Sequence, residues 1–224
     1  MDLRLTGKVA LVTGGSRGLG YQMVKAFAQH GADVFITSRK QEACAKVAAE
    51  VRTMGRKAVA HACNVANWNE LEGLVEAAYR AFGRIDILVN NAGSSPLAPS
   101  SLETPEALFD RIVSLNFKGP FRLTSLVGSR MAAGDGGSII NVSSIASQRP
   151  SPTEAPYGAA KAGVNSLTQS FAAAFGPKVR SFGSAGQWPT WLPGMGRGGT
   201  FRCGIGCWAM AWWASTRMSM TGRW

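Results

Sequence analysis

The chain has 224 residues, of which 46% are hydrophobic and 17% are charged. This composition fits one folded domain with a real core and excludes a disordered polyelectrolyte or a collagen-like chain. Four cysteines are too few for a disulfide scaffold, and no apolar run approaches the roughly 18–20 residues of a membrane span. The first residues carry no apolar signal region, so we expect a cytoplasmic protein without a membrane partner.

The net charge of +11 suggests nucleic-acid binding until it is mapped along the chain. Glu154 is the last acidic residue, and the seven lysines and arginines from residue 155 onward have no acidic counterpart. The first 154 residues hold 17 basic against 13 acidic residues, so the excess is largely regional. No motif that reads nucleic acid accompanies it, and we expect no nucleic-acid partner. The alternative, a binder driven by charge alone, predicts steeply salt-dependent DNA binding.

Short apolar runs alternate with helical patterns up to about residue 180. The predicted strands are 8–12, 33–37, 58–62, 85–90 and 138–142, and a sixth begins at 178. The predicted helices are 19–27, 43–54, 71–82, one long helix over 105–131, and 157–175. Such alternation implies right-handed crossovers, so we expect an α/β fold: a Rossmann-type doubly wound parallel sheet with helices on both faces. Ligands of such sheets bind beyond the carboxyl ends of the strands.

The composition changes after Arg180. Six of the seven tryptophans and nine glycines fall within residues 181–224, which contain no Lys, Asp or Glu. No helical or strand period persists there. We therefore expect a domain over 1–180 and an anomalous tail over 181–224 that leaves the C-terminal part of the fold incomplete or irregular. A frameshift or an unrelated C-terminus explains this composition, and a natural Trp-rich interaction tail is the alternative.

A glycine-rich turn joins the first predicted strand to the first helix. Gly14, Gly18 and Gly20 follow a Gly-x-x-x-Gly-x-Gly spacing. Glycine lets the backbone turn sharply and approach a phosphate, while the helix N-terminus offers free N–H groups and a positive dipole end. The strand–turn–helix context therefore predicts nucleotide binding.

The end of the second strand indicates which nucleotide is bound. An NAD site usually places an acidic residue there for the ribose hydroxyls, and this sequence has Thr37-Ser38-Arg39 instead. Arg39, together with Arg17 in the glycine turn, could hold a 2′-phosphate through charge-assisted hydrogen bonds. We expect NADP(H) to be preferred, with NAD(H) as the alternative cofactor, and no metal.

Further segments complete a recognisable set. Asn90-Asn91-Ala92-Gly93 ends the fourth strand, and Asn116 lies in the long helix. Ser144 follows the fifth strand, and Tyr157-x-x-x-Lys161 opens the next helix thirteen residues later. Together with the glycine turn, these motifs over residues 5–180 closely resemble the short-chain dehydrogenase/reductase family. Within it, the chain looks most similar to the 3-oxoacyl-carrier-protein reductase and gluconate 5-dehydrogenase group.

The resemblance implies an NADP(H)-dependent oxidoreductase that acts on a small carbonyl or alcohol. Tyr157 and Lys161 share a helix face, and a nearby ammonium favours the phenolate, so Tyr157 can exchange the substrate proton. The resemblance further implies that Lys161 holds the nicotinamide ribose, that Ser144 polarises the carbonyl oxygen, and that Asn116 holds a relay water.

The cofactor contacts that we expect lie in the glycine turn and at the strand ends. They are Gly14, Ser16, Arg17, Gly18, Leu19, Gly20, Ser38, Arg39, Asn64, Val65, Asn90, Ala92, Gly93, Tyr157 and Lys161. Asn64-Val65 stands where the family usually has Asp-Val beside the adenine, so a charge is lost there and binding is modestly weakened.

The C-terminus departs from the family, which has a helical lid, a last helix and a seventh strand there. If residues 181–224 are unrelated, much of the substrate pocket is missing. The alternative function is therefore a catalytically impaired or inactive nucleotide-binding product. Family members form dimers or tetramers, partly through the helices at 105–131 and 157–175, so we expect a homodimer or homotetramer.

Overall fold

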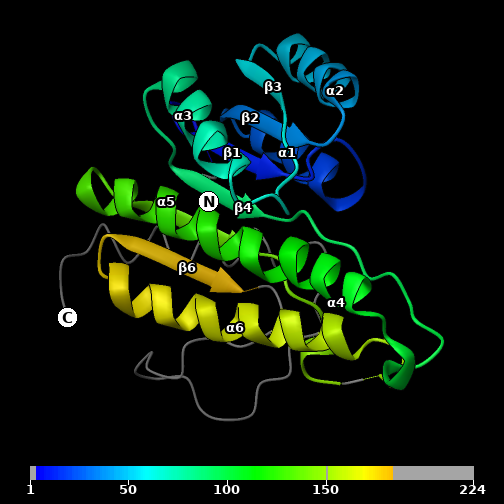
Figure 1. Ribbon diagram of the computed structural model, residues 1–224. Coiled ribbons are helices and arrows are strands. Elements are labelled where there is room, and N and C mark those ends of the chain that lie inside the picture. Colours follow the sequence, from blue (N-terminus) through cyan, green and yellow to red (C-terminus); the bar gives the residue numbers. More distant parts are fainter. Residues whose placement is uncertain (1–3, 150, 184–224) are drawn as a thin grey trace.

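The computed structural model describes residues 4–149 and 151–183, and these form a parallel sheet covered by helices (Figure 1). Its six strands have the order β3-β2-β1-β4-β5-β6, and every pair is parallel. The strands are β1 (Val9–Thr13), β2 (Asp33–Ser38), β3 (Ala58–Ala62), β4 (Ile87–Asn90), β5 (Gly137–Asn141) and β6 (Val179–Gly183). The expected Rossmann-type doubly wound sheet is confirmed.

Helices cover both faces of this sheet. They are α1 (Gly18–Gln29), α2 (Gln41–Thr53), α3 (Glu70–Phe82), α4 (Glu106–Val113), α5 (Gly119–Ala133) and α6 (Ala155–Phe175). One core cluster packs α1 and α2 against one face, and a second cluster packs α3 and α5 against the other. Since the central strands are buried on both faces, they read as continuous apolar runs in the sequence. Among the described helices, none has the length and apolar character needed to cross a membrane.

The single long helix predicted over 105–131 is wrong in one respect. A π-helical turn at Ser114–Lys118 separates α4 from α5, and the Gly119 N–H bonds to the Ser114 carbonyl five residues back. Pro120 explains the interruption, since it has no N–H to offer the Asn116 carbonyl one turn earlier. Such turns are frequent at functional sites, and this one carries the fully buried Asn116.

The sheet continues slightly past the point where the composition changes. Strand β6 runs to Gly183, and the buried Ser181 pairs with Ile139 of β5. The remainder of the tail expected over 181–224 lies outside the described residues.

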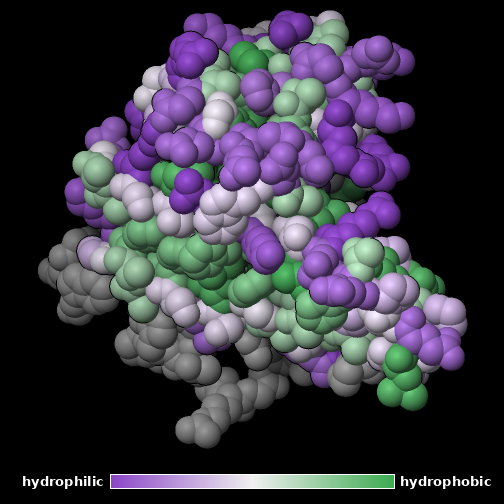
Figure 2. All heavy atoms as spheres, in the orientation of Figure 1, coloured by the Kyte–Doolittle hydropathy of each residue, from purple (hydrophilic) through white to green (hydrophobic). Residues whose placement is uncertain are grey.

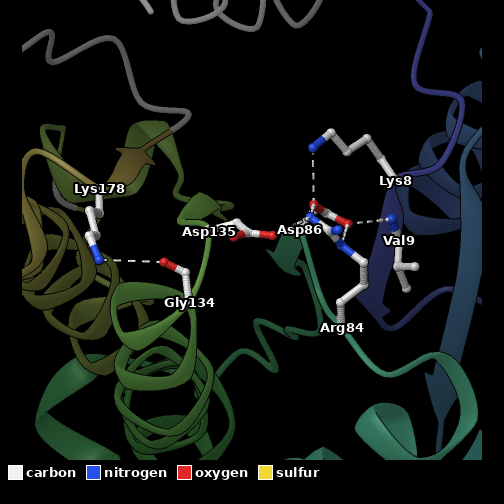
Figure 3. A network of polar contacts seen from close by, with 7 residues as sticks. All are labelled: Lys8, Val9, Arg84, Asp86, Gly134, Asp135 and Lys178. Atoms are coloured by element: carbon white, nitrogen blue, oxygen red, sulfur yellow. Dashed lines mark hydrogen bonds and ion pairs between the residues drawn. The ribbon is translucent and has the colours of Figure 1, made fainter.

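An ionic cluster clamps the N-terminal ends of β1 and β4 (Figure 3). Asp86 is only 6% exposed, and its carboxylate accepts hydrogen bonds from the Val9 N–H at 2.9 Å and from Lys8 Nζ at 3.2 Å. Arg84 donates to the same carboxylate at 2.6 and 2.9 Å and also pairs with Asp135 at 3.6 Å. This cluster closes the edge of the sheet opposite to the carboxyl ends of the strands.

We predict that Asp86→Ala lowers the free energy of unfolding by about 2–3 kcal/mol, because it leaves a buried N–H unpaired. Asp135→Ala is the matched control: this carboxylate is 85% exposed, and we expect its loss to cost less than about 0.5 kcal/mol. Urea denaturation of both variants measures the difference. Equal costs would contradict the clamp.

Candidate active site

The turn after β1 requires glycine at three of its positions. Gly14 and Gly18 have φ values of 65° and 56°, which L residues with side chains rarely adopt. A Cβ on Gly20 would lie 2.3 Å from the Gly14 carbonyl oxygen, and one on Gly14 would lie 2.9 Å from Asn91 Nδ2. The turn is therefore pressed against the segment that follows β4, and the N-terminus of α1, which has no side-chain cap, opens beyond it.

Two residues outside the predicted set of site residues fasten this turn. Thr13 Oγ1 accepts hydrogen bonds from the N–H groups of Asn91 and Ala92, both at 3.0 Å, and donates to the Val89 carbonyl at 3.1 Å. Asn91 Nδ2 donates back to the Thr13 carbonyl at 2.9 Å. The role of Asn91 could have been inferred from the sequence, because it directly follows a buried strand, where a polar side chain needs a hydrogen-bond partner.

The side chain of Asn90, a residue expected at the cofactor, is used within the protein. Its side chain is 3% exposed and bonds inside the protein, to Asn141 Oδ1 at 2.8 Å and to Thr124 Oγ1 at 3.0 Å. Asn141 continues the chain of hydrogen bonds to Thr168 on α6 at 2.9 Å. The Asn90 side chain thus joins β4, β5, α5 and α6 beneath the site.

The two arginines expected at the nucleotide lie at the ends of β1 and β2. Arg17 and Arg39 are both exposed, and neither forms an ion pair with a carboxylate in the described part of the chain. The neighbouring Ser38 hydroxyl lies 3.0 Å from the Sγ of the buried Cys44 in α2. Two unpaired guanidinium groups beside an open helix N-terminus suit a dianionic phosphate.

The Asn64-Val65 segment lies next to the π-helical turn. Asn64 is exposed, and its backbone N–H donates to Glu70 at 2.9 Å. The Val65 carbonyl would lie 2.4 Å from a Cβ on Gly119, so the glycine that begins α5 permits this close contact. The π-helical turn is thereby fixed against the end of β3.

Asn116 and Lys161 meet on either side of Gly93. A Cβ on Gly93 would lie 2.8 Å from Asn116 Oδ1 and 3.6 Å from Lys161 Nζ. The Asn116 amide nitrogen donates to the carbonyls of Ser94 and Ile112, both at 2.9 Å. Its oxygen accepts from the Ser94 N–H at 3.3 Å, so the amide is held at both ends.

Lys161 is the most unusual group at the site, because it is a buried ammonium without a carboxylate partner among the described residues. It is 4% exposed, and Nζ donates to the Val142 carbonyl at 2.7 Å. Burial lowers the pKa of Lys161 from 10.5 to about 8. Nζ lies 5.8 Å from the centroid of the half-buried Tyr157 ring, so the phenol and the ammonium share one local environment.

Ser144 begins the short helical turn between β5 and α6. Its Oγ accepts a hydrogen bond from the Ala146 N–H at 3.2 Å, which fixes the hydroxyl at the carboxyl end of β5. The helix that carries Tyr157 and Lys161 starts at Ala155, and Gly158 permits its first turn to approach the Ala146 carbonyl. Ser144 thus follows β5, Asn116 lies in the π-helical turn after α4, and Tyr157 and Lys161 lie in the first two turns of α6; Asn116 and Lys161 are the two that approach Gly93.

These residues fit a bound dinucleotide. Gly18 has open space where a Cβ would stand, so a phosphate can approach the backbone there, and the exposed Arg17 and Arg39 provide counter-charges. The residues able to hold it are the glycine turn, Arg17, Arg39, Ala92, Gly93 and Lys161.

Comparison with known proteins agrees with this geometry. The short chain dehydrogenase family pattern matches residues 8–182. The cattle protein "Dehydrogenase/reductase SDR family member 4" is 38% identical over 168 residues, which cover 75% of this chain and 60% of that protein. The Escherichia coli 7alpha-hydroxysteroid dehydrogenase is 33% identical over 177 residues, covering 79% of this chain and 69% of that one. This chain thus spans about three fifths of the cattle relative.

Solved structures are similar over the same part. A metagenomic short-chain oxidoreductase in complex with NADP superposes with a TM-score of 0.77 at 34% identity, covering 80% of this chain and 81% of that one. The 7α-hydroxysteroid dehydrogenase complexed with NADH and 7-oxo glycochenodeoxycholic acid gives a TM-score of 0.78 at 33% identity, covering 81% and 71%. With its family pattern, its parallel sheet and these relatives, the chain belongs to the short-chain dehydrogenase family of oxidoreductases.

Proposed function

We propose that this chain is an NADP(H)-dependent oxidoreductase that interconverts a small carbonyl compound and its alcohol. The observation that carries the proposal is the approach of Asn116 and Lys161 to Gly93, with Tyr157 beside the same ammonium. A side chain at this point would press on Asn116 and on the ammonium, so the glycine lets both groups lie against the loop after β4. Among the relatives, one structure is described as a complex with NADP and another as a complex with NADH.

Four side chains of this chain have separate roles in the proposed reaction. The bound nicotinamide would supply the hydride acceptor or donor. Tyr157 exchanges the proton at the substrate oxygen, and Ser144 donates a hydrogen bond to the same oxygen where negative charge develops. Lys161 favours the phenolate through its positive charge. The oxygen and the nitrogen of the Asn116 amide are both hydrogen-bonded to the backbone of Ser94, so this side chain would line the position of a relay water.

Tyr157→Phe tests the reaction. We expect NADPH oxidation with a panel of small ketones to fall at least about 100-fold, since the proton donor is removed while the ring remains. Tyr79→Phe on α3 is the matched control and should keep its activity. Unchanged turnover in Tyr157→Phe would exclude the proposed mechanism.

A nucleotide-binding product without turnover is the second candidate function. The family pattern ends at residue 182, and the chain spans 60% of the cattle relative, which supports a boundary near residue 180 and a shortened substrate pocket. Stabilisation by NADPH without turnover of any ketone would favour this candidate. Reading the coding DNA in its other two frames tests the frameshift, and the absence of an α/β pattern in both would exclude it.

The preference for NADP(H) is proposed from Arg17 and Arg39, which are exposed and have no described carboxylate partner. Arg39→Ala should weaken NADPH binding roughly tenfold, the value of one charge-assisted hydrogen bond, and leave NADH binding unchanged. Thermal melts at saturating and half-saturating nucleotide measure the binding of NADPH and of NADH, and Arg80→Ala on α3 is the control. An equal loss for both nucleotides would show that Arg39 does not read the 2′-phosphate.

The buried Lys161 predicts a pH-dependent cost to folding. Its pKa is about 8 in the folded chain, against 10.5 for a lysine in water, so below pH 8 both states are charged and the full penalty applies. Between these values only the unfolded chain holds the proton, and stability rises with pH. Lys161→Met should therefore raise the free energy of unfolding at pH 7 by about 1–3 kcal/mol, less what the unpaired Val142 carbonyl costs.

Urea denaturation at pH 7 and pH 10.5 measures this prediction. The difference between Lys161→Met and the wild type should shrink at the higher pH, while turnover is lost at both. Lys118→Met, at an exposed position, should show no such pH dependence. A stability difference that stays constant with pH would contradict the burial of a charge at Lys161.

We also propose a homodimer through α5 and α6. An aromatic row runs from Trp68 through Phe121 and Phe171 to Phe175, with centroid separations of 6.1, 5.7 and 5.2 Å. Trp68 and Phe121 are 41% and 39% exposed, and Figure 2 shows hydrophobic residues gathered over these helices. An exposed aromatic face of this kind can pair with the same face of a second copy about a twofold axis. Sedimentation should give a dimer for the wild type and a monomer for Phe121→Glu; a monomeric wild type would exclude the interface.

A further inference from the structure

A clasp of hydrogen bonds holds the loop after β4 against the start of α6. Ser95 Oγ donates to Glu154 Oε1 at 2.8 Å. Ser101 donates to the Pro152 carbonyl through its N–H at 2.8 Å and its hydroxyl at 2.7 Å, and its Oγ accepts from the Ala155 N–H at 3.3 Å. These hydrogen bonds hold residues 95–101 of the loop against residues 152–155 at the start of α6, and we call the joined segments the wall.

This wall begins inside the candidate active site. Ser94, one residue before Ser95, makes both backbone hydrogen bonds to Asn116. Gly93 precedes it and approaches Lys161. Glu154 itself is the residue before α6, and Tyr157 is in the first turn of that helix. Glu154 is thus connected to the active site in two ways. Its hydrogen bond with Ser95 joins it to the loop that contains Gly93, and its place directly before α6 puts it three residues from Tyr157.

Glu154 is also a half-buried carboxylate whose charge is not cancelled by an ion pair among the described residues. One oxygen accepts from Ser95, which is a neutral donor. The ammonium of Lys161 is buried and turned to the Val142 carbonyl. A negative charge is therefore carried by the residue directly before α6, three positions ahead of Tyr157, the proposed proton donor.

We propose that Glu154 selects substrates by charge, favouring neutral and cationic carbonyl compounds over those that carry a carboxylate or phosphate near the carbonyl. This inference rests on the proposed function, because it concerns the same reacting centre. Like charges that share a partly buried site repel strongly enough to lower kcat/KM about tenfold. Salt weakens this repulsion to the extent that solvent reaches the pair.

Two ketones that differ mainly in charge test the proposal: methyl levulinate, which is neutral, and levulinate, which is an anion. The full chain is assayed with NADPH for both. We expect the wild type to prefer the ester. Glu154→Gln keeps an acceptor for Ser95 and removes the charge, so it should raise kcat/KM for levulinate about tenfold and leave the ester within about twofold. Added salt should narrow the preference of the wild type more than that of the variant.

Glu106→Gln, at an exposed position in the first turn of α4, is the matched control and should keep the wild-type ratio. Thermal melts of all three proteins with NADPH show that fold and nucleotide binding are intact. Turnover of the ester with the same ratio in Glu154→Gln and the wild type would overturn the inference and leave the proposed function standing. No turnover of either ketone by the wild type would overturn both.

Discussion

The close approach between the ends of β1 and β4 is the constraint on which the site depends. Thr13 and Asn91 exchange hydrogen bonds across this junction, and Gly14 and Gly20 lack the side chains that would force it apart. The strand order reverses at this point, since β1 has β2 on one side and β4 on the other. A doubly wound sheet opens a crevice where its order reverses. Here the backbones of the glycine turn and of the loop after β4 lie in direct contact.

A second constraint is the burial of Lys161. A charged ammonium in this environment costs free energy that folding does not recover locally, since its described partner is the neutral Val142 carbonyl. Such strain is typical of positions where chemistry, and not stability, decides the residue. The chain of buried amides and hydroxyls from Asn90 to Thr168 holds the surrounding elements, so that the lysine has little room to move away.

Much of the fold could be predicted from the sequence, because the spacing of apolar residues and the positions of glycine turns mark each strand and helix locally. The strands and helices lie near their predicted positions, and Gly83, the residue after the predicted helix 71–82, caps α3 in the left-handed conformation. The π-helical turn could not be predicted from the apolar period, because Leu108, Ile112 and Leu115 keep helical spacing up to and into it. The roles of Thr13 and Asn91 could not be predicted, since they join residues 78 positions apart. The likeness to the 3-oxoacyl-carrier-protein reductase and gluconate 5-dehydrogenase group stays a prediction.

The junction between β1 and β4 also constrains how the chain folds. Val9 and Asp86 are 77 residues apart, so the sheet can close there only after β2, β3 and their helices have been accommodated. Contacts of such long sequence separation form slowly, because loop closure precedes the gain from pairing. The glycine turn and the loop after β4, where we propose that the nucleotide binds, consequently meet late in folding. On a ribosome it cannot exist before Ala92 has emerged, and nucleotide capture by a nascent chain would report the moment at which the two halves of the sheet join.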